Sequence, residues 1–218
     1  MAGTILTLAQ QKGGSGKTTL AAHLAVALMR KRHAVALLDT DPQGSLGEWF
    51  EARERTLGED GVGLTFRTAS GWGARREARS LKRDHDFVVV DTPPKSDLES
   101  RPAIEAADLV VVPIQPTPVD LWATDPTLEL MAKEDADGIL VVNRALRRAS
   151  LTAEMLGRID QLGHRVARNA LGNRVAFAAA MGEGRTVSEA QPSSLAAGEV
   201  DALTKELVKL TRALEKQR

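Results

Sequence analysis

The sequence predicts an α/β fold: a doubly wound, mostly parallel sheet flanked by helices, with residues 1–218 forming a single domain. Apolar runs alternate with amphipathic segments along the chain, as expected for strands joined by helices. Aromatic residues make up only 3% of the chain, so Val, Leu, Ala and Ile must build the core, which suits buried parallel strands. A glycine-rich loop separates the first apolar run from a helical segment, which is typical of this class.

Each element is expected from a short apolar run or from a helical period. The expected strands are residues 4–9, 34–38, 64–68, 87–90, 109–114 and 139–142. The expected helices are residues 18–31, 72–83, 97–106, 119–133, 152–161 and 194–216. Pro126 should interrupt the fourth helix, because proline cannot continue a helical hydrogen-bond ladder. The last helix places four leucines on one stripe, which predicts packing against the sheet.

The glycine-rich loop reads Lys-Gly-Gly-Ser-Gly-Lys-Thr-Thr over residues 12–19. Its glycines let the backbone curl so that successive N–H groups face an anion, and the helix that follows adds its positive end. Lys17 is expected to meet the β- and γ-phosphates, and the Thr18 hydroxyl to ligate Mg²⁺. The pattern therefore predicts that the chain binds a nucleoside triphosphate. The expected contact residues are Gly13, Gly14, Ser15, Gly16, Lys17, Thr18 and Thr19.

Polar residues follow three of the other expected strands, at the edge of a parallel sheet where ligands bind. Asp39 and Asp41 point the same way, because side chains alternate along an extended segment. Asp91 ends an apolar strand, which is the Walker B arrangement for holding Mg²⁺, usually through water. Asn143 offers both a donor and an acceptor, which can read the edge of adenine. ATP and Mg²⁺ are thus the expected cofactors.

The loop pattern K-G-G-x-G-K-[ST], with Lys12 at its front, resembles the deviant Walker A motif of the ParA/MinD family of P-loop ATPases. The resemblance implies slow ATP hydrolysis and a homodimer that forms when ATP is bound. It also implies that Lys12 reaches the phosphates held by the other subunit. Asp41 of the D-x-D-P-Q segment is implied to orient the attacking water, Asp39 to support the metal, and Asn143 to bind the base.

Most of the chain is similar to small ParA proteins, including residues 173–177 and 184–189. The first strand starts at residue 4, so we expect no N-terminal DNA-binding domain. The resemblance implies a cytoplasmic, nucleoid-associated protein that binds DNA without sequence specificity. It would segregate or position a plasmid, chromosome or protein cargo, with a ParB-like or cargo-adaptor protein stimulating hydrolysis. Basic residues exceed acidic ones only after residue 143, so the candidate DNA contacts are Arg144, Arg147, Arg148, Arg165, Arg168, Arg174, Arg185, Lys205, Lys209 and Arg212.

Two other functions fit parts of this pattern. A MinD-like membrane-associated positioning ATPase shares all the nucleotide motifs and ends in an amphipathic helix, as this chain does. The continuous connection to that helix and its lack of Phe or Trp favour packing in the core, so no membrane contact is expected. A metabolic enzyme related to amidotransferase synthetases would need a second domain. The chain has no cysteine, which excludes a disulfide framework, a thiolate zinc site and a cysteine-ligated iron–sulfur cluster.

Overall fold

A computed structural model describes residues 3–94, 97–146 and 150–217. One six-stranded sheet has the order β3-β2-β4-β1-β5-β6, and every strand pairing in it is parallel. The fold is therefore the predicted α/β P-loop architecture, and the ends of β1, β2 and β4 meet at one edge. The strands are β1 (Thr4–Leu8), β2 (Val35–Asp39), β3 (Thr65–Thr68), β4 (Phe87–Asp91), β5 (Leu109–Ile114) and β6 (Gly138–Val142).

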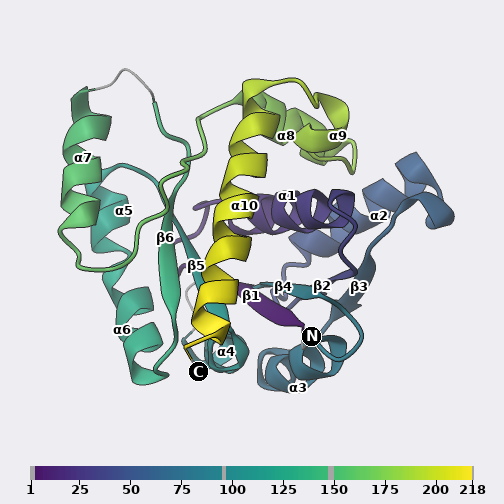
Figure 1. Ribbon diagram of the computed structural model, residues 1–218, viewed down its shortest axis with the longest axis horizontal. Coiled ribbons are helices and arrows are strands. Elements are labelled where there is room, and N and C mark those ends of the chain that lie inside the picture. The colour runs from purple at the N-terminus through teal and green to yellow at the C-terminus, as the bar shows by residue number, and fades with distance from the viewer. Residues whose placement is uncertain (1–2, 95–96, 147–149, 218) are drawn as a thin grey trace.

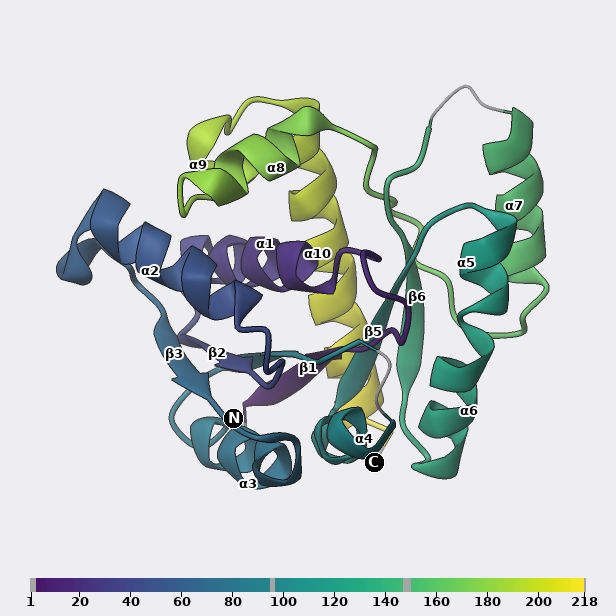
Figure 2. The same ribbon diagram turned by 180° about the vertical axis from the view of Figure 1, so that it is seen from behind.

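Helices cover both faces of the sheet (Figures 1 and 2). The residues of each strand point alternately to the two faces, so a strand such as β4 contributes Val89 to one core and Val88 to the other. The first face carries α1 (Lys17–Arg30), α2 (Ser45–Leu57), α8 (Val175–Gly182), α9 (Val187–Ala190) and α10 (Leu195–Glu215). The second face carries α3 (Gly71–Leu81), α4 (Asp97–Ala106), α5 (Pro118–Trp122), α6 (Asp125–Lys133) and α7 (Ser150–Asp160).

The structure confirms the six predicted strands and the predicted helices to within a few residues. The predicted helix over 119–133 is split at Ala123 and Thr124, and Pro126 lies in the first turn of α6, where its missing N–H costs nothing. Three helices were not predicted. α2 buries a stripe at helical spacing (Leu46, Trp49, Phe50 and Arg53), but Gly47 and many charged residues weaken that signal in the sequence. α8 is apolar on all sides and α9 has only four residues, so neither shows a helical stripe.

The C-terminal helix α10 packs in the core, as the sequence predicts. Leu203, Leu207 and Leu214 are buried, and Leu210 is half-buried against them. These leucines join the same cluster as α1 and strands β1, β5 and β6 (Figure 1). In the part of the chain that the structure describes, no helix combines the length and the apolar character needed to cross a membrane.

A buried ion pair ties α2 to α9. The Arg53 side chain is 1% exposed and donates to both Glu189 carboxylate oxygens, at 2.7 and 2.9 Å. Arg53 also donates to the carbonyls of Val62 and Gly184, so its guanidinium makes four hydrogen bonds with its five N–H groups. Glu189 also forms a capping box with Thr186 at the start of α9, which gives both residues of the 184–189 segment a structural role.

Candidate nucleotide site

The glycine-rich loop leaves β1 and enters α1 in a conformation that needs glycine. Gly14 and Gly16 have φ angles of 76° and 97°, in the left-handed region where side chains cause strain. A Cβ on Gly16 would also lie 2.3 Å from the Asn143 side-chain nitrogen. The helix then begins at Lys17, so its N-terminus points at the loop as predicted.

Side chains hold the carbonyl groups of this loop away from its centre. Gln115 Nε2 donates to the Gly14 carbonyl at 3.0 Å, and Asn143 Nδ2 donates to the Ser15 carbonyl at 2.8 Å. Because these carbonyls are fixed from the ends of β5 and β6, the loop's N–H groups are left for an incoming anion. Within residues 3–94, 97–146 and 150–217, the N–H groups of residues 13–16 have no intramolecular acceptor.

Lys17 lies inside this loop and is buried. Its Nζ donates to the Gln10 carbonyl at 2.9 Å, which places the ammonium against the backbone that the loop encloses. Burial lowers the pKa of Lys17, although the carboxylates of Asp91 and Asp41 oppose that effect. A phosphate group in the loop would supply the counter-charge that this buried ammonium needs.

Thr18 and Asp91 meet at the position expected for a metal. Thr18 Oγ1 donates to Asp91 Oδ2 at 2.6 Å. Among the described residues, Asp91 Oδ1 and the Ser15 hydroxyl are the buried side-chain polar atoms without a hydrogen-bond partner. Burial raises the pKa of Asp91 to about 7, and the Thr18 hydrogen bond and the Lys17 ammonium oppose that shift only in part. A hydrated Mg²⁺ fits this donor set, because that ion keeps several waters and shares its ligands with phosphates.

No group of three His, Cys, Asp or Glu side chains in the described part of the chain could hold a metal by itself.

Asp39 and Asp41 lie at the end of β2, beside Asp91, but they make different contacts. Asp39 accepts hydrogen bonds from the N–H groups of Asp41 at 2.9 Å and Gly47 at 3.2 Å, so both of its oxygens shape the turn into α2. Burial raises the pKa of Asp39. Asp41 is half-buried and accepts from the Gln43 N–H at 2.9 Å. The roles of Asp39 near the metal and of Asp41 in hydrolysis stay predictions.

Lys12 does not share the position of Lys17. Its Nζ lies 2.6 Å from Asp120 Oδ2 in α5, and the Asp120 carboxylate also accepts from the Thr117 hydroxyl. The Lys12 side chain is 29% exposed, whereas that of Asp120 is 3% exposed. The loop therefore carries two lysines in two environments, one buried inside it and one held at its outer side.

Sequence reasoning did not identify several polar side chains whose hydrogen bonds hold the loop in place. Gln10 is buried and contacts Thr124 Oγ1 at 3.1 Å and Thr127 Oγ1 at 3.3 Å. Asp120 and Gln115 were missed as well. These side chains are far from their hydrogen-bond partners in the sequence. Gln10 is 114 residues from Thr124, and Gln115 is 101 residues from Gly14. The only signal in the sequence is a polar residue beside an apolar run, which is common.

A cavity of about 260 Å³ lies beside the loop, at the side where β6 ends. Asn143 lines it together with His23 of α1 and Phe177 of α8, whose rings meet edge to face at 5.1 Å. Its apolar walls and the nearby amide suit a nucleotide base. Asn143 uses its Nδ2 on the loop and accepts from the Arg144 N–H at 2.9 Å, so its contact with a base stays a prediction.

The structure divides the predicted DNA contacts into groups. Arg165, Arg174 and Lys205 are tied to Asp137, Glu199 and Asp201 by ion pairs. Arg147 and Arg148 lie outside the described residues. The other candidates, none of which takes part in an ion pair within the described ranges, are Arg144, Arg168, Arg185, Lys209 and Arg212.

The fold and this site define the chain as a P-loop ATPase. The family model described as "ATPase MipZ" matches residues 4–156, so the chain belongs to that family and, with it, to the ParA/MinD group of deviant Walker A ATPases. The group includes proteins that position cargo in bacterial cells. The recognition of the family, the fold and the ATPase activity from the sequence is therefore confirmed.

Relatives match nearly the whole chain. Maintenance of carboxysome distribution protein A of Halothiobacillus neapolitanus is 29% identical over 210 residues, covering 93% of this chain and 95% of the relative. The chromosome-partitioning ATPase Soj of Thermus thermophilus is 30% identical over 242 residues, covering 93% and 94%.

Solved structures share the fold at lower identity. An ATP complex of a Cyanothece McdA variant superposes with a TM-score of 0.77 at 17% identity, covering 97% of both chains. The septum site-determining protein MinD of Pyrococcus horikoshii, complexed with Mg-ADP, gives 0.78 at 19% identity, covering 97% of this chain and 98% of MinD. Members of this group thus bind adenine nucleotides and Mg²⁺ in the same fold.

Proposed function

We propose that residues 1–218 act as one domain that pairs face to face when it binds ATP. The observation that carries this proposal is the separation of the two lysines of the loop. Lys17 is placed for the phosphates of its own nucleotide, while Lys12 is held outside the loop by Asp120. In this proposal the Lys12 ammonium does not contact the nucleotide of its own subunit. It can therefore neutralise a triphosphate held by a second copy.

Hydrolysis in this scheme is phosphoryl transfer to water, in which the protein supplies position and charge. Lys17 and the N-terminus of α1 hold the phosphates, and Asp41 orients the water and takes up its proton. Thr18 and Asp91 would hold Mg²⁺ together with water, and the ion would supply positive charge for the phosphates. Asn143 contacts the base. No Gln or Arg lies within the loop, so basal hydrolysis is slow until a partner completes the site.

The proposed role is to distribute a cargo by cycling between DNA-bound and free states. The ATP dimer aligns basic residues of both copies, contacts DNA phosphates without reading sequence, and so associates with the nucleoid. Arg144, Arg168, Arg185, Lys209 and Arg212 are the candidates that are exposed or half-exposed and form no ion pair with another described residue. A ParB-like or cargo-adaptor partner then stimulates hydrolysis and releases the dimer. The names of two relatives support a carboxysome-like protein assembly or a chromosome as cargo, and one structural neighbour, from Borrelia burgdorferi, is named as a putative plasmid partition protein.

The test compares mass and DNA binding in the same samples. With ATP, Asp41→Ala should hydrolyse ~100-fold more slowly but should still dimerise and shift a random DNA fragment. Lys12→Ala should still bind ATP yet stay monomeric, and wild-type protein with ADP should behave in the same way. DNA binding should weaken steeply between low and moderate salt. An ATP-loaded Asp41→Ala protein that stays monomeric contradicts the proposal.

The membrane-associated alternative is tested in parallel with vesicles that contain anionic lipid. The burial of Leu203, Leu207 and Leu214 leaves α10 no free apolar stripe for a membrane, so we expect no ATP-dependent flotation. Flotation with ATP in the absence of a DNA shift would favour the MinD-like function instead.

A further inference from the structure

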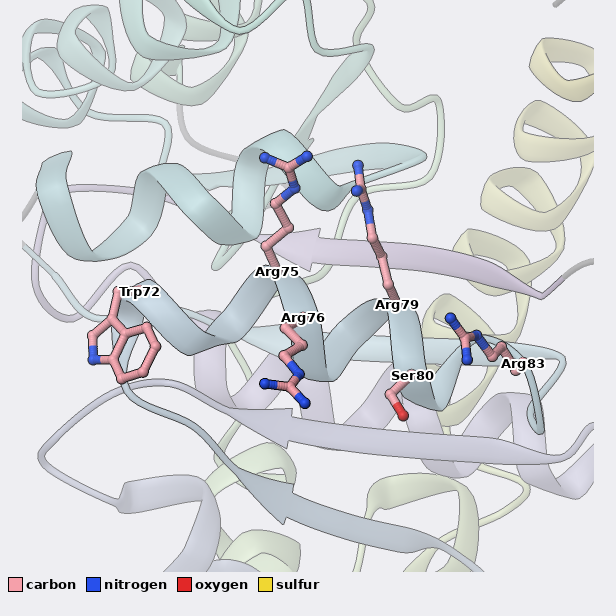
Figure 3. Close-up of a pocket in the computed structure, with 6 residues that line it drawn as sticks. All are labelled: Trp72, Arg75, Arg76, Arg79, Ser80 and Arg83. Atoms are coloured by element: carbon pink, nitrogen blue, oxygen red, sulfur yellow. The ribbon is translucent and has the colours of Figure 1, made fainter.

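The outer face of α3 forms a surface hollow with an unusual composition. The hollow has a volume of about 520 Å³, and the side chains that line it come from α3, on the second face of the sheet, and from the turn after it (Figure 3). Its walls are one aromatic residue, four arginines and a serine. These are Trp72, Arg75, Arg76, Arg79, Ser80 and Arg83, and we call this surface the α3 face.

Most of the positive charge on the α3 face is not neutralised internally. Arg75 pairs with Glu105 of α4 at 2.5 Å. Among the described residues, no carboxylate lies within ion-pair distance of Arg76, Arg79 or Arg83. Figure 3 shows Arg75 and Arg79 on one side of the helix and Arg76 on the other, so the guanidinium groups flank the hollow. Guanidinium groups stay charged at any physiological pH and grip carboxylates through paired hydrogen bonds.

Two large apolar side chains lie at the start of this face. Trp72 is 86% exposed, and Leu98 at the start of α4 is 84% exposed. The two helices touch there, because a Cβ on Gly71 would lie 2.7 Å from the Glu99 Cα. Trp72 follows Gly71 in α3, and Leu98 precedes Glu99 in α4. Both therefore lie next to this contact and add apolar surface to one end of the row of arginines. Exposed apolar groups rimmed by polar ones mark protein-binding surfaces.

We propose that the α3 face binds an acidic segment of a partner protein that also carries an apolar side chain. Tryptophan and arginine dominate the energetics of protein interfaces, and here they line one hollow. Such a segment places carboxylates on Arg76, Arg79 and Arg83 and its apolar side chain against Trp72. The α3 helix has 11 residues and is ~16 Å long, which about five residues of an extended peptide would span.

A nucleic acid fits this face less well. Double-helical DNA would use the arginines but leave Trp72 and Leu98 exposed to water. Glu77 within α3 and Asp84 in the turn after it are sequence neighbours of Arg76 and Arg83 and would repel a continuous row of phosphates. A peptide can place its carboxylates on the arginines and avoid both acidic residues.

The α3 face is separate from the loop, so the interaction requires no nucleotide and its test does not depend on the proposed ATP cycle. The chain has three tryptophans, which gives an internal control in an indole NMR spectrum. Trp72 lies on the α3 face, Trp49 is buried and Trp122 is exposed in α5. The probe is a synthetic peptide of about eight residues, mostly Glu and Asp with one central Leu, which exceeds the length that α3 requires.

We expect the Trp72 indole signal to move on titration of the full chain at physiological salt, while those of Trp49 and Trp122 stay in place. The double variant Arg76→Glu and Arg79→Glu should bind the peptide at least about tenfold more weakly. The control Arg158→Glu, an exposed residue of α7, should bind it like the wild type, and all three proteins should bind ATP equally.

Three results would overturn the inference. The first is a Trp72 signal that stays in place up to millimolar peptide. The second is an equal response to a peptide in which Lys replaces Glu and Asp. The third is a short DNA duplex that moves the Trp72 signal at a lower concentration than the acidic peptide does, which would assign the surface to nucleic acid.

Discussion

Lys12 Nζ lies 2.6 Å from Asp120 Oδ2, so the first lysine of the loop is bound within its own subunit. The carboxylate is almost fully buried and also accepts from Thr117, which fixes its position. In the proposed dimer Lys12 reaches a nucleotide held by a second copy, and this ion pair would have to open first. The contact would then oppose dimerisation until a bound triphosphate replaces Asp120 as the partner of Lys12.

Asp120→Asn tests that cost. The substitution removes the ion pair but keeps an oxygen that can accept the Thr117 hydrogen bond. A charge-assisted hydrogen bond at a partly exposed site contributes about 1–2 kcal/mol, and the dimer would open one in each subunit, so the ATP-dependent dimer should become roughly a hundredfold tighter. Sedimentation with ATP and with ADP measures this, with the exposed Asp125→Asn as the matched control. A dimer that is unchanged or weaker would show that Asp120 does not restrain Lys12.

Asn143→Ala separates two roles of one side chain. The amide anchors the Ser15 carbonyl at 2.8 Å and also lines the cavity beside the loop. Loss of a buried hydrogen bond should weaken ATP binding about tenfold. The comparison of ATP with GTP then decides the cause. A preference for ATP that survives assigns the loss to the loop, and a preference that disappears assigns it to the base.

Glu189→Ala should destabilise the fold strongly, because it leaves the buried Arg53 guanidinium without its partner. Breaking a buried ion pair costs about 3–5 kcal/mol. Burial raises the pKa of Glu189, but the hydrogen bonds and charge of Arg53 outweigh that effect, so the pKa lies below its usual range. Urea unfolding at neutral pH measures the loss. Glu154→Ala removes an exposed ion pair with Arg158 and should cost less than about 1 kcal/mol. Equal effects of the two substitutions would contradict this ranking.

His23 should make the fold sensitive to acid. Burial lowers its pKa to about 4, although the Thr19 carbonyl and Glu189 oppose the shift. The neutral ring donates from Nδ1 to the Thr19 carbonyl and accepts the Val187 N–H at Nε2. Between about pH 4 and 6.5 the His23 ring is protonated in the unfolded chain but neutral in the folded chain. The free energy of unfolding therefore rises with pH across that window by roughly 3 kcal/mol. In His23→Gln, urea unfolding from pH 7 to pH 4.5 should show a flatter profile. An unchanged slope would mean that other groups cause the pH dependence.

The sequence predicted the strands and the loop because their signals are local. Apolar runs such as β4, and glycines at the left-handed positions 14 and 16, report the structure directly. The partners of the loop could not be predicted in this way. Asp120 lies 108 residues from Lys12 and is one acidic residue among many, and Gln115 lies 101 residues from Gly14. Only the folded sheet brings the ends of β5 and β6 to the loop.

A count of charges along the chain does not show which basic residues the fold leaves unpaired. The C-terminal third carries the excess of basic residues, but Arg165, Arg174 and Lys205 form ion pairs with carboxylates of the same chain. Arg76 and Arg79 lie in a part of the chain with a net negative charge, yet they remain unpaired among the described residues. Charge counted in sequence order ignores which ions the fold neutralises.

The two amides that hold the loop's carbonyls bear on protein engineering. Gln115 and Asn143 come from neighbouring strands, and neither belongs to the eight residues of the motif. A graft of the motif alone onto another strand–helix junction would keep the glycines but free the Gly14 and Ser15 carbonyls to rotate inward and repel phosphate. A transplanted loop needs both amides to travel with it.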